Sequence, residues 1–222
     1  METEHEQQVP TITHVDSKSH PPRTCEQCGR EFRARLRRTE HLELCSPCVE
    51  KWRQFCEFCP QIYRVTDPDQ LPCGPDKLAA VLRWQYGSRG ILLHGPTERG
   101  KTRAAWSLLR RLHFEGREIV AFNAVSFSHE VGYHFGPDGN AVRWVRRIYN
   151  AAIVFLDDVG KCRLTERGEA ELFGLVETRT AQDRPIIATT NFVGNTLAAT
   201  MHPETGAALV RRLREFCECI AF

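Results

Sequence analysis

A phosphate-binding pattern occupies residues 95–102 of the chain. The pattern is G-x-x-x-x-G-K-[ST], and it is filled by Gly95-Pro96-Thr97-Glu98-Arg99-Gly100-Lys101-Thr102. In such a loop, backbone N–H groups and the positive end of the following helix surround the phosphates, and the lysine reaches the outer ones. The Thr102 hydroxyl would bind magnesium, and Arg103 completes the candidate nucleotide-binding residues. The pattern predicts binding of a nucleoside triphosphate, with Lys101 also acting in catalysis.

Glu98 is an unusual residue for this loop, because many related loops have glycine there. A carboxylate near a polyphosphate would repel it unless the side chain points outward. We expect Glu98 to point away from the nucleotide.

Two acids end the apolar run that begins at Ala152. Asp157 would hold magnesium through its water shell, and Asp158 would be the general base that polarises the attacking water. The acids could instead only cap the turn before Gly160. Their position downstream of the phosphate-binding loop favours the catalytic interpretation.

Polar side chains from two later segments complete the candidate site. Asn191, with Thr190 as the alternative, follows an apolar run and would hydrogen-bond the attacking water or the terminal phosphate, although such an asparagine is often an ordinary loop residue. Arg211, Arg212 and Arg214 lie on a predicted helix near the end of the chain. One of them could act as an arginine finger on a neighbouring subunit's nucleotide. The alternative is a solvated basic helix face.

Cysteine pairs mark a second kind of site near the start of the chain. Cys25-x-x-Cys28 and Cys45-x-x-Cys48 have the spacing of a four-thiolate zinc site. The third pair, Cys56 and Cys59, leaves three possibilities open: it replaces one of the first two pairs, remains as spare thiols, or joins His41 in a second site. We expect the first four cysteines to be the zinc ligands, because the longer loop between them leaves room for a short strand or helix.

Residues 30–38 carry five arginines in nine positions, with Phe32 among them. Such dense arginine suits contact with nucleic-acid phosphates. A solvated face or a docking surface for an acidic protein would have the same composition, and the sequence does not separate these interpretations.

The elements that must position these residues alternate along the chain from Gly90 onward. Short apolar runs predict strands at 90–94, 118–122, 152–157, 185–189 and 217–222. Amphipathic segments between them predict helices at 101–114, 141–150, 166–180 and 206–215, and a further helix at 77–86 precedes them. This alternation is typical of an α/β fold with a parallel sheet.

The 222 residues allow one core of ordinary size and a small appendage. We expect a disordered tail at 1–22, a four-cysteine zinc-binding module at 23–60, a linker with a leading helix at 61–88, and the P-loop domain at 89–222. The formal net charge of +2 excludes strong nucleic-acid attraction by the chain as a whole. Because no apolar run is long enough to span a bilayer and the first residues are polar, we expect a soluble, cytoplasmic protein without membrane contact.

Taken together, four segments resemble the AAA+ ATPases of the DnaC and IstB type, which are bacterial and phage helicase loaders and transposon-targeting ATPases. The segments are GILLHGPTERGKT, IVFLDDVGK, ETRTAQDRPIIATTN and LVRRLREF, and they cover about residues 90–222. The resemblance implies a five-stranded parallel sheet flanked by helices, ATP with Mg²⁺, ATP-dependent self-assembly, and action on single-stranded DNA with a replicative helicase or another DNA-remodelling protein.

Within that family, the last helix carries an Asp-Arg-Leu-like motif, onto which Arg211-Arg212-Leu213 falls. The resemblance therefore assigns the finger to Arg212, although Arg211 replaces the usual acid. The helical lid of fuller AAA+ proteins is expected to be absent or truncated. A helicase loader is the leading expectation. A zinc-dependent adaptor that uses ATP as a switch and an IstB-like transposition ATPase are the alternatives.

Overall fold

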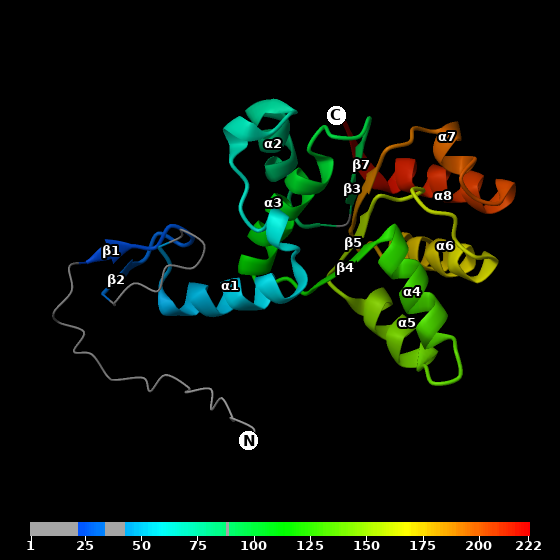
Figure 1. Cartoon of the computed structure of the whole chain (residues 1–222), viewed down its shortest axis with the longest axis horizontal. Coiled ribbons are helices and arrows are strands. Elements are labelled where there is room, and N and C mark those ends of the chain that lie inside the picture. Colours follow the sequence, from blue (N-terminus) through cyan, green and yellow to red (C-terminus); the bar gives the residue numbers. More distant parts are fainter. Residues whose placement is uncertain (1–21, 34–42, 88) are drawn as a thin grey trace, which may run out of the picture. The chain divides into compact units, whose positions relative to one another are not determined.

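The computed structural model describes residues 22–33, 43–87 and 89–222 (Figure 1). The chain divides into two compact units, Met1–Glu50 and Lys51–Phe222. In the described ranges, no helix is both long and apolar enough to cross a membrane. Residues 1–21 of the predicted tail lie outside the described ranges.

The larger unit is built on a five-stranded sheet in which every neighbouring pair of strands is parallel. The strand order is β4-β5-β6-β3-β7. Its strands are β3 (Gly90–His94), β4 (Ile119–Asn123), β5 (Ile153–Asp157), β6 (Ile186–Thr190) and β7 (Cys217–Ala221). The predicted five-stranded parallel sheet is thereby confirmed. Because β6 lies between β5 and β3, the residues that follow these three strands meet at one edge of the sheet.

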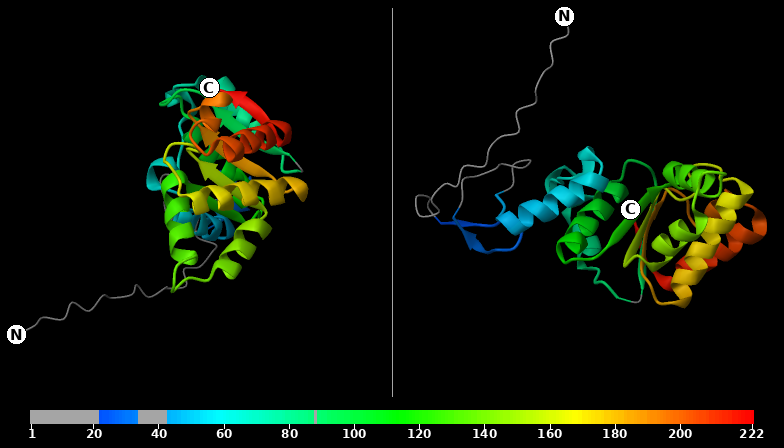
Figure 2. Two further views of the ribbon diagram at one scale, coloured as in Figure 1. Left: turned by 90° about the vertical axis from the view of Figure 1, so that its right-hand side faces the viewer. Right: turned by 90° about the horizontal axis from the view of Figure 1, so that it is seen from below.

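Helices cover both faces of this sheet (Figures 1 and 2). One face carries α2 and α3, and the other carries α4, α5, α6 and α8. The helices of this unit are α2 (Gly74–Arg83), α3 (Lys101–Phe114), α4 (Ala124–His134), α5 (Ala141–Asn150), α6 (Glu166–Ala181), α7 (Asn195–Ala198) and α8 (Pro203–Phe216). Two 3-10 turns, η2 (Gln61–Tyr63) and η3 (Pro68–Gln70), precede α2.

The strands are apolar on both sides because both faces of the sheet are covered. Val154, Leu156 and Ala188 belong to one buried cluster with residues of α4, α5, α6 and α8. Phe155, which lies between the first two, instead contacts Trp106 of α3, with ring centroids 5.3 Å apart. Residues that alternate along β5 therefore pack into different layers, and the strand is fixed between them.

Several predicted boundaries agree with the structure and others need correction. The ranges 90–94, 101–114 and 141–150 coincide with β3, α3 and α5. The helix expected at 77–86 begins earlier, at Gly74, because Pro75 suits the first turn of a helix and lacks the N–H that this turn leaves unpaired. The same effect starts α8 at Pro203 instead of Gly206. No element was predicted for α4.

Arg179 of α6 is fully buried and ties three backbone segments together. Its guanidinium donates hydrogen bonds to five carbonyl oxygens. These belong to Ile148, Tyr149, Ala151, Ala152 and Pro185, at 2.8–3.2 Å. Burial lowers the pKa of Arg179 to about 10, so the side chain remains charged at neutral pH. The arginine fixes the end of α5 against the starts of β5 and β6, the strands that lead to Asp157 and Asn191.

The smaller unit contains a two-stranded antiparallel ribbon. Its strands are β1 (Arg23–Thr24) and β2 (Glu31–Phe32), in which Arg23 pairs with Phe32. Helix α1 (Ser46–Phe58) begins in this unit. Most of the arginine-rich run, from residue 34 onward, lies outside the described ranges.

Candidate functional site

The loop between β3 and α3 forms an exposed turn around a buried lysine. A Cβ atom on Gly95, whose φ is 137°, would lie 2.4 Å from the Phe222 carbonyl oxygen, so only glycine fits there. Pro96 to Arg99 are exposed, whereas Lys101 is buried. The Lys101 amine donates hydrogen bonds to the carbonyl oxygens of Gly95 at 2.9 Å and Pro96 at 2.5 Å. The amine is thus held inside the loop, where a polyphosphate would bind.

Glu98 has a φ of 61°, in the left-handed region that favours glycine. Glu98 is exposed, as are Pro96, Thr97 and Arg99, so the expectation that it points away from the nucleotide stays a prediction. The backbone conformation gives a physical reason why glycine suits this position.

Asp157, the last residue of β5, links helix α3 to the neighbouring strand β6. Its Oδ1 atom accepts hydrogen bonds from the Thr102 hydroxyl at 2.8 Å and from the Thr189 hydroxyl at 2.6 Å. Burial raises the pKa of Asp157, and the two hydroxyl hydrogen bonds oppose that shift. Thr102 and Asp157 offer adjacent oxygen atoms of the kind that Mg²⁺ prefers, so the residues fit that ion. Thr189 was not predicted. A polar residue within the otherwise apolar run at 185–189 could have indicated it.

Asp158 follows at the edge of the sheet in a left-handed conformation, with a φ of 57°. Its backbone N–H donates to the Thr189 hydroxyl at 2.9 Å. Its carboxylate forms an ion pair with the Lys161 amine at 2.6 Å. The Lys161 side chain is 62% exposed and that of Asp158 is 22% exposed, so the carboxylate is accessible from the solvent side.

The two candidates at the end of β6 differ in their surroundings. Thr190 is buried, and its hydroxyl donates to the Val159 carbonyl oxygen at 2.7 Å and accepts from the Phe192 N–H at 3.2 Å. Asn191 is only half-buried. The Thr190 hydroxyl is thus engaged with the backbone, and the role of Asn191 toward a ligand stays a prediction.

Arg212 does not join this group in the single subunit. Its guanidinium forms two hydrogen bonds with the Glu177 carboxylate of α6, at 2.7 and 2.6 Å. This pairing lowers the pKa of Glu177 and raises that of Arg212. Arg211 is exposed. The structure therefore brings Lys101, Thr102, Asp157 and Asp158 together. Arg212 lies apart from them, where α8 contacts α6.

A groove of about 520 Å³ borders the two acids. Its polar lining includes Asp157, Asp158 and Lys161. Aromatic side chains, among them Tyr63 and Trp106, form other parts of the wall. Tyr63 comes from η2, which no sequence pattern places at this site.

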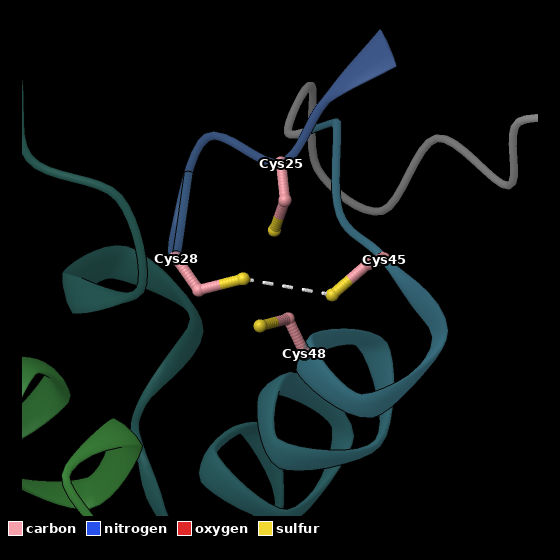
Figure 3. A group of neighbouring side chains, drawn as sticks. All are labelled: Cys25, Cys28, Cys45 and Cys48. Carbon is pink, nitrogen blue, oxygen red and sulfur yellow. Dashed lines mark hydrogen bonds between the residues drawn. The ribbon is translucent and has the colours of Figure 1, made fainter. Parts of the chain in front are cut away.

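The first four cysteines converge in the smaller unit (Figure 3). Their sulfur atoms all lie within 4.8 Å of one another, and the Cys28 and Cys45 sulfurs are 3.7 Å apart. Cys25 and Cys28 flank a tight turn after β1, in which the Gly29 N–H donates to the Cys25 carbonyl oxygen at 2.9 Å. Cys48 lies in the first turn of α1, and Cys45 directly precedes that helix. Four convergent sulfurs fit the ligand chemistry of zinc.

The third cysteine pair is not part of this cluster. Cys56 lies in α1 and Cys59 follows that helix. His41, the other candidate ligand, lies outside the described residues. Among the residues that the structure describes, the first four cysteines form the one group of three or more His, Cys, Asp or Glu side chains that could hold a metal ion.

The parallel sheet, the glycine-rich loop after β3 and the two acids at the end of β5 define the P-loop nucleotide-binding core of AAA+ proteins. Residues 70–222 match the family described as IstB-like ATP binding protein. The chain belongs to this family.

One relative by sequence and two structures of similar fold accompany the family match. A Mycobacterium tuberculosis protein, named as an ATP-binding protein in an insertion sequence, is 27% identical over 127 residues, which are 57% of this chain. The chain covers 50% of that relative's length. AMPPCP-bound DnaA from Aquifex aeolicus is similar in structure, with a TM-score of 0.59 and 16% identity, over 74% of this chain and 51% of DnaA. The DnaC helicase loader has a TM-score of 0.57 and 18% identity, over 77% of this chain and 99% of DnaC.

Proposed function

We propose that the chain binds ATP with magnesium and hydrolyses it. The observation that carries the proposal is the hydrogen-bonded group of Thr102, Asp157 and Thr189 beside the Lys101 loop. Lys101 and the α3 N-terminus would bind the phosphates, and Thr102 and Asp157 would hold the magnesium ion. When bound, the ion neutralises phosphate charge. Asp158 would take the proton of the attacking water, and Asn191 would orient that water.

One observation favours a second function for the same site. Asp158 is already paired with Lys161, and a carboxylate held in an ion pair is not free to turn toward an attacking water. The chain would then use ATP as a switch, with little turnover. Phosphate release from ATP, with and without magnesium, measured beside nucleotide binding, separates the two functions. Binding without magnesium-dependent release would leave only the switch.

We further propose that ATP drives self-assembly, with Arg212 completing a neighbour's site. Release of Arg212 from Glu177 would then accompany assembly. Arg212→Ala is expected to lower kcat about 100-fold without weakening ATP binding, because a finger stabilises charge that develops in the transition state. Phosphate release and the ATP dissociation constant measure these two effects. Light scattering with and without ATP and single-stranded DNA measures assembly.

Arg167→Ala provides the matched control, since Arg167 also pairs with a glutamate, Glu171, at 3.1 Å. Mixing Arg212→Ala with Lys101→Ala subunits gives the sharper test. The first variant keeps an intact loop and the second keeps an intact finger, so the mixture should regain activity. A protein that stays monomeric under every condition would exclude this role.

The family match and the charge on the surface support a proposal about the partners. We propose that the ATPase acts on DNA together with a DNA-remodelling protein, either an insertion sequence's transposase or a replicative helicase. The family match and the insertion-sequence relative favour the transposition role. The helicase-loader role rests on likeness of fold. Co-purification with each candidate partner in the presence of ATP discriminates between these roles.

Helix α5 offers a surface for DNA phosphates. Arg143, Arg146 and Arg147 are exposed and share one helix face, because residues three and four apart are neighbours on a helix. None of them forms an ion pair within the described ranges. Replacing all three by glutamine is expected to weaken single-stranded DNA binding. The negative slope of log K against log salt should become shallower by about 2, at roughly 0.7 per lost phosphate contact.

Fluorescence anisotropy at several salt concentrations measures both quantities. Arg146→Glu and Arg83→Glu form a matched pair, since both arginines are exposed on helices and both changes alter the net charge equally. Equal losses in the two variants would show that only net charge matters, and would contradict an α5 surface.

A further inference from the structure

A short segment in front of the family-matched residues is fastened along α3. The backbone carbonyl oxygens of Arg64 and Val65 accept hydrogen bonds from Arg110 at 3.3 Å and from Arg103 at 3.2 Å. The Arg64 side chain in turn donates to the Cys56 carbonyl oxygen at 2.9 Å. The segment around η2 is therefore fixed against the helix that begins at Lys101, although it lies outside residues 70–222.

This attachment places Tyr63 beside the catalytic acids. The guanidinium carbon of Arg103 lies 5.5 Å from the centre of the Tyr63 ring, which fixes the ring by a cation–π contact. The Tyr63 side chain lines the same groove as Asp157, Asp158 and Lys161. Burial raises the pKa of Tyr63, and the two carboxylates raise it further. The phenol therefore keeps its proton at neutral pH and is a hydrogen-bond donor.

The ring and the hydroxyl have separable roles. The contact with Arg103 needs only the aromatic ring, so packing alone would be satisfied by phenylalanine. Tyr63 lines the groove together with Asp157 and Asp158. A role for the hydroxyl itself is therefore to be sought in that groove. Lys161 binds the Oδ2 atom of Asp158, which leaves the Oδ1 atom for another donor.

We propose that Tyr63 is a positioning residue of the ATP-hydrolysing site, whose hydroxyl donates a hydrogen bond to the Asp158 carboxylate, directly or through one water molecule. It would hold the carboxylate toward the attacking water, against the pull of Lys161. The proposal rests on the hydrolytic function proposed above. It adds to the family's core a residue that the preceding segment supplies.

Tyr63→Phe tests the hydroxyl alone, because the ring that contacts Arg103 is kept. We expect kcat to fall about tenfold, the effect of one hydrogen bond to a charged group. The KM for ATP and the melting temperature should stay within error, which a packing role would not predict. Tyr86→Phe is the matched control, since Tyr86 also lies under an arginine, Arg117, at 4.0 Å, and does not line the groove.

A second measurement keeps the test independent of turnover. Binding of Mg-ADP is compared with binding of Mg-ADP and aluminium fluoride, which mimics the transferring phosphoryl group. Tyr63→Phe should weaken the fluoride complex about tenfold relative to wild type and leave Mg-ADP binding unchanged. If wild type does not hydrolyse ATP, the hydrolytic function fails, and this comparison still decides the role of Tyr63.

Three results would overturn the proposal. The first is an unchanged kcat together with an unchanged fluoride complex in Tyr63→Phe. The second is an equal loss in Tyr86→Phe. The third is a fall in melting temperature that accompanies weaker ATP binding, which would show that the hydroxyl serves packing.

Discussion

Lys101→Ala is expected to abolish ATP hydrolysis, lowering kcat/KM by about 1,000-fold or more, and to weaken ATP binding. The amine is buried and held at 2.9 and 2.5 Å from the Gly95 and Pro96 carbonyl oxygens. Burial lowers the pKa of Lys101, whereas the Asp158 and Asp157 carboxylates oppose that shift. Phosphates that enter the loop would replace the carbonyl oxygens as its partners, so the alanine variant loses the main positive charge of the cradle.

Lys51→Ala is the matched control for this experiment. Lys51 also donates to a backbone carbonyl oxygen, that of Phe114, at 2.6 Å, at the opposite end of α3 from Lys101. A companion variant, Asp158→Ala, should retain ATP binding and lose turnover. Phosphate release and binding of a fluorescent ATP analogue give the two readouts. An intact fold in which Lys101→Ala binds and hydrolyses ATP as wild type does would refute the proposed site.

The sequence predicts elements well where apolar runs end at clear signals. Gly90 and Gly95 bound β3, and the loop glycines define the start of α3, so these ranges agree with the structure. The helix at 141–150 is equally clear, because Trp144 and Ile148 repeat at helical spacing and are buried.

Helix α4 could not be recognised in the same way. It begins at Ala124, directly after β4 ends at Asn123, so no loop composition separates the two elements. Its start is set by a capping box in which the Asn123 side chain and the Ser126 side chain each bond the other's backbone N–H. Its exposed Val125 and Tyr133 also blur the apolar face that marks a helix.

The site residues also divide into those that local sequence patterns predict and those that only tertiary contacts bring to the site. Local patterns indicated Lys101, Thr102 and Asp157, because each motif carries its own chemistry. Thr189 and Tyr63 reach the site only through strand order and through the attachment of η2 to α3, which are tertiary features. The pairing of Arg212 with Glu177 across α8 and α6 is likewise a tertiary contact that the basic helix pattern could not predict.

Removal of metal is expected to unfold the smaller unit. Four sulfurs bound tetrahedrally at about 2.3 Å from one zinc ion would lie about 3.8 Å apart, close to the 3.7 Å between the Cys28 and Cys45 sulfurs. In the described part of this unit, regular structure is limited to two short strands and the start of α1. A unit of this size has too little core to fold without a staple. Zinc binding, worth roughly 10–16 kcal/mol in small zinc-stapled units, would supply the missing stability.

Metal analysis of the full chain should therefore find one zinc ion, and Cys45→Ser with Cys48→Ser should remove it. Protease sensitivity near Cys25 should rise in that variant, while ATP binding by the unit from Lys51 to Phe222 persists. Cys56→Ser with Cys59→Ser is the matched control, because it removes a pair of the same spacing outside the cluster. Loss of zinc in the control and its retention in the first variant would show that Cys56 and Cys59 bind the ion in place of Cys45 and Cys48. The close approach of the first four sulfurs argues for the opposite result, in which the strand turn and the start of α1 are joined by one ion.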